Sequence, residues 1–214
     1  MIIVNEKLAF MLIPKNASSS LRHYYGCKYT SDGEYVNDLL VMNYNNGIKR
    51  VCRFEHDLSG EKVRNEHIDL QTITSQTLIS NNTRVIAVIR CPIERQLSLY
   101  FYRHKHKKQQ RYQTTELSVS DFRGRMKEGF LLDDFSWQMR LQTWFTKHET
   151  KQVEYWLYEE VNEKFKEFGD LGTHNISTKY NTKDLIDVFY DTETLKATRK
   201  YWEEDIGLYE SLKR

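Results

Sequence analysis

The apolar residues of this chain gather in short runs that alternate with segments of helical spacing. The runs at residues 10–13, 84–90 and 153–158 are too short for buried helices, and residues 84–90 are rich in valine and isoleucine. Such a run is typical of a buried strand in a parallel sheet. A helix is expected to begin at Leu21, after the first run. Apolar residues three or four positions apart predict further helices at residues 93–104, 119–127, 133–145, 160–168 and 182–212.

Strands that alternate with helices predict an α/β fold with a central, mostly parallel sheet flanked by helices, and a helical C-terminal part. Two further strands, at residues 39–44 and 48–54, are joined by Asn45-Asn46-Gly47, which predicts a β-hairpin because Asn and Gly tolerate positive φ. The 214 residues contain no low-complexity linker, so we expect a single domain over residues 1–214.

Composition and charge exclude several classes of protein. The net charge of +2 gives no overall polyelectrolyte character, so we expect neither nucleic acid nor a membrane surface as a partner. The three cysteines, Cys27, Cys52 and Cys91, are widely spaced, which argues against a disulfide framework and a cysteine zinc site. The N-terminus lacks a signal-peptide pattern and no apolar run reaches the length of a membrane span, so we expect a cytoplasmic protein.

The residues that carry candidate chemistry begin directly after the first apolar run. Pro14 ends this strand, because proline cannot donate to a sheet ladder, and Lys15 follows it. A turn of small residues and the start of a helix come next, made of Asn16, Ala17, Ser18, Ser19 and Ser20. Unpaired N–H groups at a helix start attract anions, the hydroxyls add donors, and the lysine ammonium suits phosphate. This stretch therefore predicts an anion-binding loop.

Two observations limit that interpretation of the loop. In the simpler alternative the serines only cap the helix, which serine does well. The loop also differs from the usual nucleotide P-loop, since the Gly-x-x-x-x-Gly-Lys-Ser/Thr pattern is absent and no glycine precedes Gly26.

A second group of polar residues follows the strand at residues 84–90. Arg90 ends that strand, and Ser98 lies two turns into the following helix. Because ligands of open parallel sheets bind at the carboxyl ends of strands, we expect Arg90 and the Lys15 loop to open onto one crevice. An arginine fork with a serine hydroxyl suits a phosphate monoester. The alternatives are a salt bridge at the edge of the sheet for Arg90 and a buried small residue for Ser98.

Taken together, the two stretches resemble a known enzyme family. Pro-Lys-x-Ala-Ser-Ser-Ser-Leu after one strand and Arg-x-Pro-x-x-Arg-x-x-Ser-x-Tyr after a later one are similar to motifs of sulfotransferases that use 3′-phosphoadenosine 5′-phosphosulfate. In particular, they resemble carbohydrate sulfotransferases of the Golgi type and their soluble microbial relatives. Asn175-Ile-Ser-Thr and Phe189-Tyr-Asp resemble the closing loop and helices of this family. The resemblance implies a P-loop-like central sheet.

The resemblance also implies a role for each residue of the two motifs. The first loop would hold the 5′-phosphosulfate of the donor through Pro14, Lys15, Asn16, Ala17, Ser18, Ser19 and Ser20. Arg90 and Ser98 would bind the 3′-phosphate. Lys15 would neutralise the charge that shifts during in-line transfer to an acceptor hydroxyl, by analogy with phosphoryl transfer, and no metal is required. The acceptor would be a carbohydrate or another small hydroxylated molecule.

A general base must take the proton of the acceptor hydroxyl, and histidine suits that task near neutral pH. The sequence favours His56, because it leaves the hairpin beside Glu55 and Asp57, either of which can orient its ring. His67 and Glu55 are the alternatives, and a plain surface histidine is the simplest interpretation of His56.

Two other functions fit parts of the pattern. A P-loop-like kinase for a nucleotide or small molecule would need ATP and magnesium, but the glycine loop is missing. A non-catalytic binder of sulfated or phosphorylated ligands would use Lys15, Arg90 and the basic run at residues 103–111, which otherwise is a solvated helix end. The sequence leaves the acceptor and the oligomeric state open.

Overall fold

The structure, a computed structural model, describes residues 1–27, 33–56, 62–65, 67–105, 118–128, 140–172 and 182–214. At residues 54–56, 62–64 and 103–105 it describes the backbone alone. The described residues form two compact units, each made of two stretches of chain. The stretches are Met1–Ile89 with Arg140–Asn175 in the first unit, and Arg90–Met139 with Ile176–Arg214 in the second.

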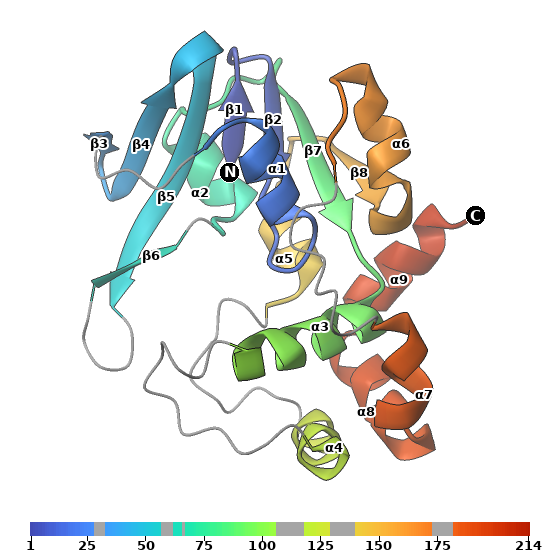
Figure 1. The fold of residues 1–214 in the computed structure, drawn as a ribbon. Helices are drawn as coiled ribbons and strands as arrows, with labels where there is room; N and C mark the ends of the chain where they lie inside the picture. The colour runs from blue at the N-terminus through green and yellow to red at the C-terminus, as the bar shows by residue number, and fades with distance from the viewer. Residues whose placement is uncertain (28–32, 57–61, 66, 106–117, 129–139, 173–181) are drawn as a thin grey trace. The chain divides into compact units, whose positions relative to one another are not determined.

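The first unit is built on one sheet, in which the strand order is β3-β4-β5-β1-β2-β7-β8 and β6 pairs with β5 (Figure 1). Its centre is β2 (Leu8–Met11), which pairs antiparallel with β1 (Ile2–Val4) and parallel with β7 (Arg84–Ile89). The outer strand β8 (Val153–Leu157) is parallel to β7. Every residue of β7 after Arg84 is buried, as its apolar sequence predicts.

The other half of the sheet is an antiparallel meander. β5 (Ile48–His56) pairs with β1 on one side and with β4 (Leu39–Tyr44) on the other. β3 (Glu34–Val36) pairs with β4, and β6 (Lys62–Asn65) pairs with the end of β5. These antiparallel strands therefore extend the sheet on the side opposite to β7 and β8.

The prediction of a mostly parallel sheet is wrong. In the described sheet only the pairs β2–β7 and β7–β8 are parallel, and the other pairs are antiparallel. The connections at residues 5–7 and 45–47 are too short for a crossover and can join only antiparallel neighbours. The predicted hairpin is confirmed, and its turn has φ of 60° at Asn46 and 68° at Gly47.

Helices cover both faces of the sheet in the first unit. α1 (Ser18–Tyr24) and α6 (Val161–Lys164) lie on one face, and α2 (Leu70–Ser75) and α5 (Gln142–Thr146) lie on the other (Figure 1). The short 3-10 turns of this unit are η1 (Asn45–Gly47), η2 (Tyr158–Glu160) and η3 (Phe165–Glu167). The central strands are thereby shielded from water on both sides.

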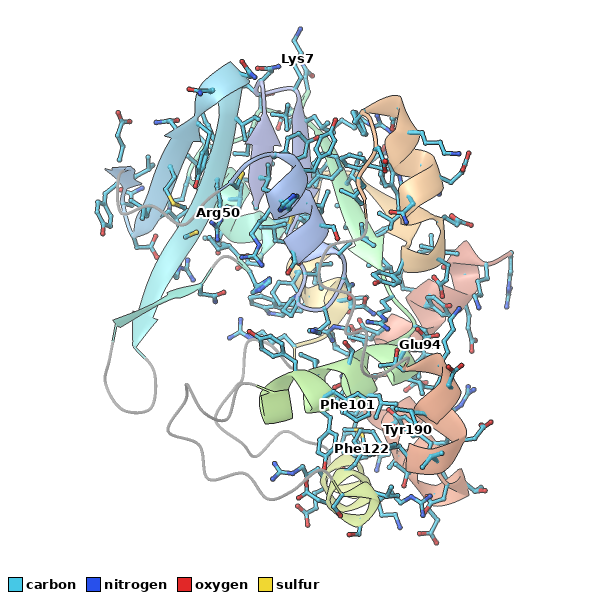
Figure 2. The ribbon with its side chains drawn as sticks, in the orientation of Figure 1. Lys7, Arg50, Glu94, Phe101, Phe122 and Tyr190 are labelled. Carbon is cyan, nitrogen blue, oxygen red and sulfur yellow. The ribbon has the colours of Figure 1, made fainter. Side chains whose placement is uncertain are left out.

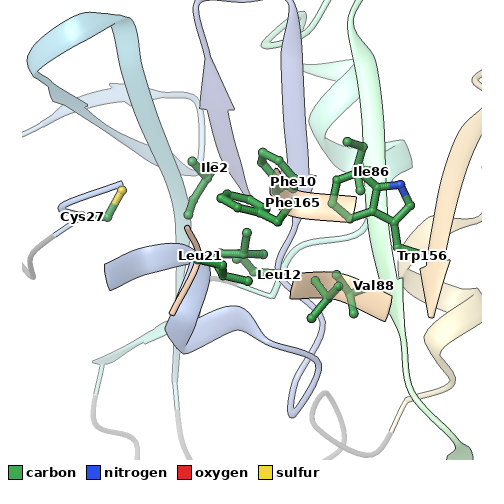
Figure 3. Packing of buried hydrophobic residues seen from close by; sticks show 11 residues of the cluster. Ile2, Phe10, Leu12, Leu21, Cys27, Ile86, Val88, Trp156 and Phe165 are labelled. Atoms are coloured by element: carbon green, nitrogen blue, oxygen red, sulfur yellow. The ribbon is translucent and has the colours of Figure 1, made fainter. Parts of the chain in front are cut away.

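The core between the sheet and α1 is rich in aromatic rings (Figure 3). The ring centroid of Phe10 in β2 lies 5.7 Å from that of Phe165 and 6.2 Å from that of Trp156. Leu21 of α1 and Val88 of β7 belong to the same buried cluster. Burial of one such side chain contributes about 1.5–3 kcal/mol, so this cluster holds α1, and with it the loop before α1, against the sheet.

The second unit is helical, as predicted for the C-terminal part of the chain. Its helices are α3 (Pro92–Lys105), α4 (Val119–Lys127), α7 (Ile186–Phe189), α8 (Thr192–Tyr201) and α9 (Glu203–Leu212), with the turn η4 (Lys183–Leu185). Phe101, Phe122 and Tyr190, labelled in Figure 2, form an aromatic core with Tyr100 and Phe189. The ring centroids of contacting pairs lie 5.0 to 6.1 Å apart.

The predicted element boundaries hold to different degrees. α4 has the predicted bounds, whereas the helix expected at residues 133–145 starts only at Gln142 within the described part. Residues 133–139 lie outside that part. Cys27, Cys52 and Cys91 are not joined in disulfides. Among the described helices, none has both the length and the apolar character needed to cross a bilayer.

Candidate active site

The anion-binding loop predicted from the sequence connects β2 to α1. Pro14 and Asn16 are buried in it, and Asn16 is fully so. Lys15 and Ala17 have φ of 67° and 59°, in the left-handed region of the backbone. This region costs a residue with a side chain about 1–2 kcal/mol. The loop therefore needs contacts from outside itself to keep this shape.

The three serines do not cap α1. The N-cap residue is Ala17, whose side chain forms no capping hydrogen bond. Ser18 is buried and donates its hydroxyl to the carbonyl of Ile13 at 2.7 Å, across the base of the loop. Ser20 is also buried, and Ser19 is half-buried. The simpler interpretation of the serines as helix caps is therefore wrong.

Asn16 ties the loop to two other elements of the first unit. Its side-chain Nδ2 donates to the carbonyl of Val88 in β7 at 2.7 Å and to Oε1 of Gln142 at 2.5 Å. Gln142 is fully buried at the first residue of α5. Sequence reasoning missed Gln142, because 126 positions separate it from Asn16 and no local motif marks it.

His67 lies at the base of the same loop. Its ring Nδ1 is hydrogen-bonded to the carbonyl of Leu12, and its backbone N–H donates to Oδ1 of the buried Asn65 at 2.9 Å. A carbonyl oxygen only accepts, so a neutral His67 carries its hydrogen on Nδ1 and its lone pair on Nε2. Since Leu12 shortly precedes Lys15, the structure brings this alternative base beside the start of the loop.

His56 is the last residue of β5, and its backbone pairs with Lys62 of β6. The side chains of His56 and Glu55, and residues 57–61, lie outside the described part of the chain. The assignment of His56 as the base therefore stays a prediction. Two other predicted features lie outside it as well: the side chains of the basic run at residues 103–111 and the motif at residues 175–178.

In the second unit, the buried guanidinium of Arg90 contacts Thr182 and Glu94. Its Nη2 donates to the hydroxyl of Thr182 at 2.7 Å and to the carboxylate of Glu94 at 3.4 Å. Glu94 lies one turn before the half-buried Ser98, so the two share one face of α3. Arg90 and Glu94 form an ion pair, which their i, i+4 spacing could have indicated, and the assignment of Arg90 to a phosphate stays a prediction. Nothing in the local sequence marks Thr182.

A second buried arginine lies in the same unit. Burial lowers the pKa of the Arg95 guanidinium to about 10; the carboxylate of Asp205 opposes this shift, and the charge of Arg90 adds to it. Arg95 and Asp205 are both fully buried. Among the described residues of this unit, two guanidinium groups and two carboxylates are buried: those of Arg90 and Arg95, and those of Glu94 and Asp205. Arg90 and the Lys15 loop belong to different units, and the crevice expected to join them stays a prediction.

The described residues were also compared with two other kinds of site, a metal centre and a surface hollow. The described side chains include no group of three His, Cys, Asp or Glu arranged to hold a metal ion. A hollow lined in part by Arg84, Lys151 and Glu154 lies at the start of β7 and β8. Since the Lys15 loop lies beyond the other end of β2, which is parallel to β7, this hollow is not part of the candidate site.

One protein family matches almost the whole chain. The family model described as "Sulfotransferase family" covers residues 1–210. No curated protein and no solved structure matches the chain. The matched range contains both the Lys15 loop and the Arg90 motif.

Removal of the Ser18 hydroxyl should destabilise the protein, because Ser18 braces the loop through a buried hydrogen bond. Ser18→Ala should lower the free energy of unfolding by about 1–2 kcal/mol in urea titrations. The control is Ser19→Ala, whose half-buried hydroxyl accepts from Arg22 at 3.0 Å and should cost less than about 0.5 kcal/mol. Equal losses for the two variants would contradict the bracing role of Ser18.

Proposed function

The chain belongs to the sulfotransferase family, and from this premise we propose that it transfers a sulfuryl group from 3′-phosphoadenosine 5′-phosphosulfate to the hydroxyl of a carbohydrate or another small molecule. Membership of the family supports sulfuryl transfer, and the donor and the acceptor are our proposal. One observation carries the donor. A loop with Lys15, followed by a helix start without a side-chain cap, leaves the strand that pairs in parallel with β7.

The loop supplies the groups that a phosphosulfate needs. The backbone N–H groups at the start of α1 carry partial positive charge, and the N-cap residue, Ala17, has no side-chain capping bond to them. The ammonium group of Lys15 adds a full positive charge in the same loop. We therefore assign the 5′-phosphosulfate of the donor to this loop.

For the 3′-phosphate we assign Arg90 and Ser98. The Arg90 guanidinium contacts Glu94 at 3.4 Å, which is long beside the 2.7–2.9 Å or so of a strong charge-assisted hydrogen bond. A phosphate monoester carries more charge than a carboxylate and can accept two parallel bonds from arginine. We expect the phosphate to compete successfully with Glu94 for this guanidinium.

The transfer breaks the bond between sulfur and the bridging phosphate oxygen, and it forms a bond between sulfur and the acceptor oxygen. Adenosine 3′,5′-bisphosphate leaves, and the proton of the acceptor hydroxyl passes to a base. Lys15 would offset the negative charge that grows on the bridging oxygen, and the loop would hold the donor in line with the acceptor. Since Lys15 and Arg90 supply positive charge at both ends of the donor, we expect binding without a metal ion.

For the base we propose a histidine, and His67 and His56 are the two candidates. The Leu12 carbonyl holds Nδ1 of His67, which orients the ring and directs its lone pair to Nε2. This contact beside the loop favours His67, whereas the sequence alone favours His56. A positioned general base typically contributes a factor of about 10²–10⁴ to the rate.

The protein should bind adenosine 3′,5′-bisphosphate without added metal, and more tightly than 5′-AMP or ATP with magnesium. A hydrogen bond to a charged group contributes about 1.5–3 kcal/mol, so 5′-AMP should bind at least about tenfold more weakly. Isothermal titration calorimetry with the three nucleotides measures this preference directly.

Variants of two arginines provide the control for this binding experiment. Arg90→Gln should abolish the preference over 5′-AMP. Arg84→Gln should keep it, because Arg84 is paired with Glu154 and Glu167 at the start of β7. Equal affinity of the wild type for both adenosine nucleotides would remove Arg90 and Ser98 from the site. A preference for ATP with magnesium would favour a kinase instead.

His67→Asn should lower the turnover number by about 10²–10⁴, because the amide can donate to the Leu12 carbonyl as Nδ1 does but cannot act as a base. The affinity for adenosine 3′,5′-bisphosphate should stay within about threefold. In the wild type, kcat/KM should fall at acidic pH, since a protonated imidazole cannot accept the proton. These rates can be measured as the transfer of a radiolabelled sulfuryl group from the donor to an acceptor. The acceptor is first selected from a panel of glycans and small alcohols.

The controls for the base are His56→Asn and His148→Asn, which should retain most of the turnover. His148 contacts Thr74 through its ring Nε2 at 2.7 Å, and it has no role in the proposed transfer. Loss of turnover in His56→Asn alone would identify His56 as the base. Full turnover in all three variants would rule out a histidine base among them.

A further inference from the structure

The backbone of the Lys15 loop is held in an unfavourable conformation by contacts outside the loop. Lys15 and Ala17 both have positive φ, and neither is glycine. At about 1–2 kcal/mol each, these two residues would relax if nothing opposed them. Asn16 lies between them and supplies opposing contacts.

Asn16 uses all of its hydrogen-bond donors within the protein. The NH₂ group of its side-chain amide carries two hydrogens. One is donated to the carbonyl of Val88 at 2.7 Å and the other to Oε1 of Gln142 at 2.5 Å. Its backbone N–H donates to the carbonyl of Ile13 at 3.2 Å. The side chain is fully buried. Asn16 therefore acts on the shape of the loop rather than as a donor to a bound anion.

The contact with Val88 joins the loop to the sheet. β2 and β7 pair in parallel as far as Met11 and Ala87. Val88 is the next residue of β7, and its carbonyl receives the side-chain amide of Asn16. The amide thus continues the link between the two segments after β2 has ended.

The contact with Gln142 fixes the orientation of the amide. Because one hydrogen of Nδ2 points at Val88 and the other at Gln142, the plane of the Asn16 amide cannot rotate without loss of a hydrogen bond. The Gln142 side chain is fully buried at the start of α5, so it has little freedom to follow such a rotation. The two bonds therefore restrain the Asn16 side chain, and through it the backbone of the loop to which it is attached.

The remaining polar atom of Asn16 argues against a role in packing alone. Its Oδ1 is buried and has no hydrogen-bond partner among the described residues. An unsatisfied buried acceptor costs about 1–3 kcal/mol, and an apolar side chain of similar size would avoid this cost. The two bonds that the amide donates are what an apolar side chain could not supply.

We propose that Gln142 is a positioning residue for sulfuryl transfer, which acts through Asn16 to set the backbone of Lys15 and thereby the place of its ammonium group. The inference rests on the proposed function, since it is the transfer that makes the position of Lys15 matter. A displacement of about 1 Å in a catalytic group can lower a rate about 10²-fold. Loss of the Gln142 contact should therefore reduce turnover much more than donor affinity.

Two variants of Gln142 and one control test this role. Gln142→Met removes the acceptor and nearly conserves the volume, whereas Gln142→Glu keeps an oxygen acceptor at the same place. The control is Thr146→Val in the same helix. Thr146 is buried too, and its hydroxyl donates to the backbone carbonyls of Gln142 and Thr143 and accepts from Tyr155, so these bonds involve neither the Gln142 side chain nor the loop.

Two measurements on the full chain separate positioning from stability. In Gln142→Met, hydrogen exchange of the backbone amides at residues 12–21 should be at least about tenfold faster, and turnover should fall about 10- to 100-fold. The Kd of adenosine 3′,5′-bisphosphate should change less than about threefold. Gln142→Glu should keep the slow exchange, and Thr146→Val should resemble the wild type in exchange and turnover.

The inference would be overturned if Gln142→Met showed the same rate of amide hydrogen exchange and the same turnover number as Thr146→Val. Failure of the wild type to bind adenosine 3′,5′-bisphosphate would instead reject the proposed function, and the exchange comparison would still decide whether Gln142 holds the loop. If Gln142→Met does not fold, Gln142→Asn takes its place, because it withdraws the acceptor by one methylene group and should give the same direction of change.

Discussion

The candidate site depends on the parallel pairing of β2 with β7. Because the two strands run in the same direction, their carboxyl ends lie at the same edge of the sheet. The chain leaves β2 there as the Lys15 loop, and Asn16 of this loop donates to the carbonyl of Val88 in β7. The antiparallel strands β1, β3, β4, β5 and β6 extend the sheet on the side of β2 away from β7.

Two kinds of contact hold the loop on this edge, and they do different work. The aromatic cluster around Phe10 and Phe165 holds α1 against the sheet through non-directional burial. The hydrogen bonds from Asn16 to Val88 and Gln142 are directional, and they select one conformation of the loop. Apolar packing therefore sets where the loop lies, and buried amide contacts set its shape.

The buried charges of the second unit are expected to add little to the stability of the fold. Arg95 and Asp205 are fully buried, and removal of two such charges from water offsets most of their mutual attraction. In the function we propose, Arg90 is already held by Thr182 and Glu94 and would exchange the carboxylate of Glu94 for the 3′-phosphate. Groups that need little reorganisation when an anion binds give strong electrostatic stabilisation.

Local sequence patterns predicted the local parts of this structure. The apolar run of β7, the Asn-Gly hairpin turn and the bounds of α4 all depend on neighbouring residues, and each is confirmed. The mostly parallel sheet was wrong, because strands as short as β1 and β3, three residues each, carry too little periodicity to be recognised. Gln142 and Thr182 were missed because their partners are distant in sequence, and only the folded chain brings them together.

A crystal structure of the protein with adenosine 3′,5′-bisphosphate is the most direct test of the central claim. We expect the 5′-phosphate about 2.7–3.0 Å from the ammonium of Lys15 and from backbone N–H groups at the start of α1. The 3′-phosphate should lie on the guanidinium of Arg90 with the carboxylate of Glu94 displaced. A nucleotide bound with its 5′-phosphate away from the Lys15 loop would contradict the assignment of that loop as the donor site.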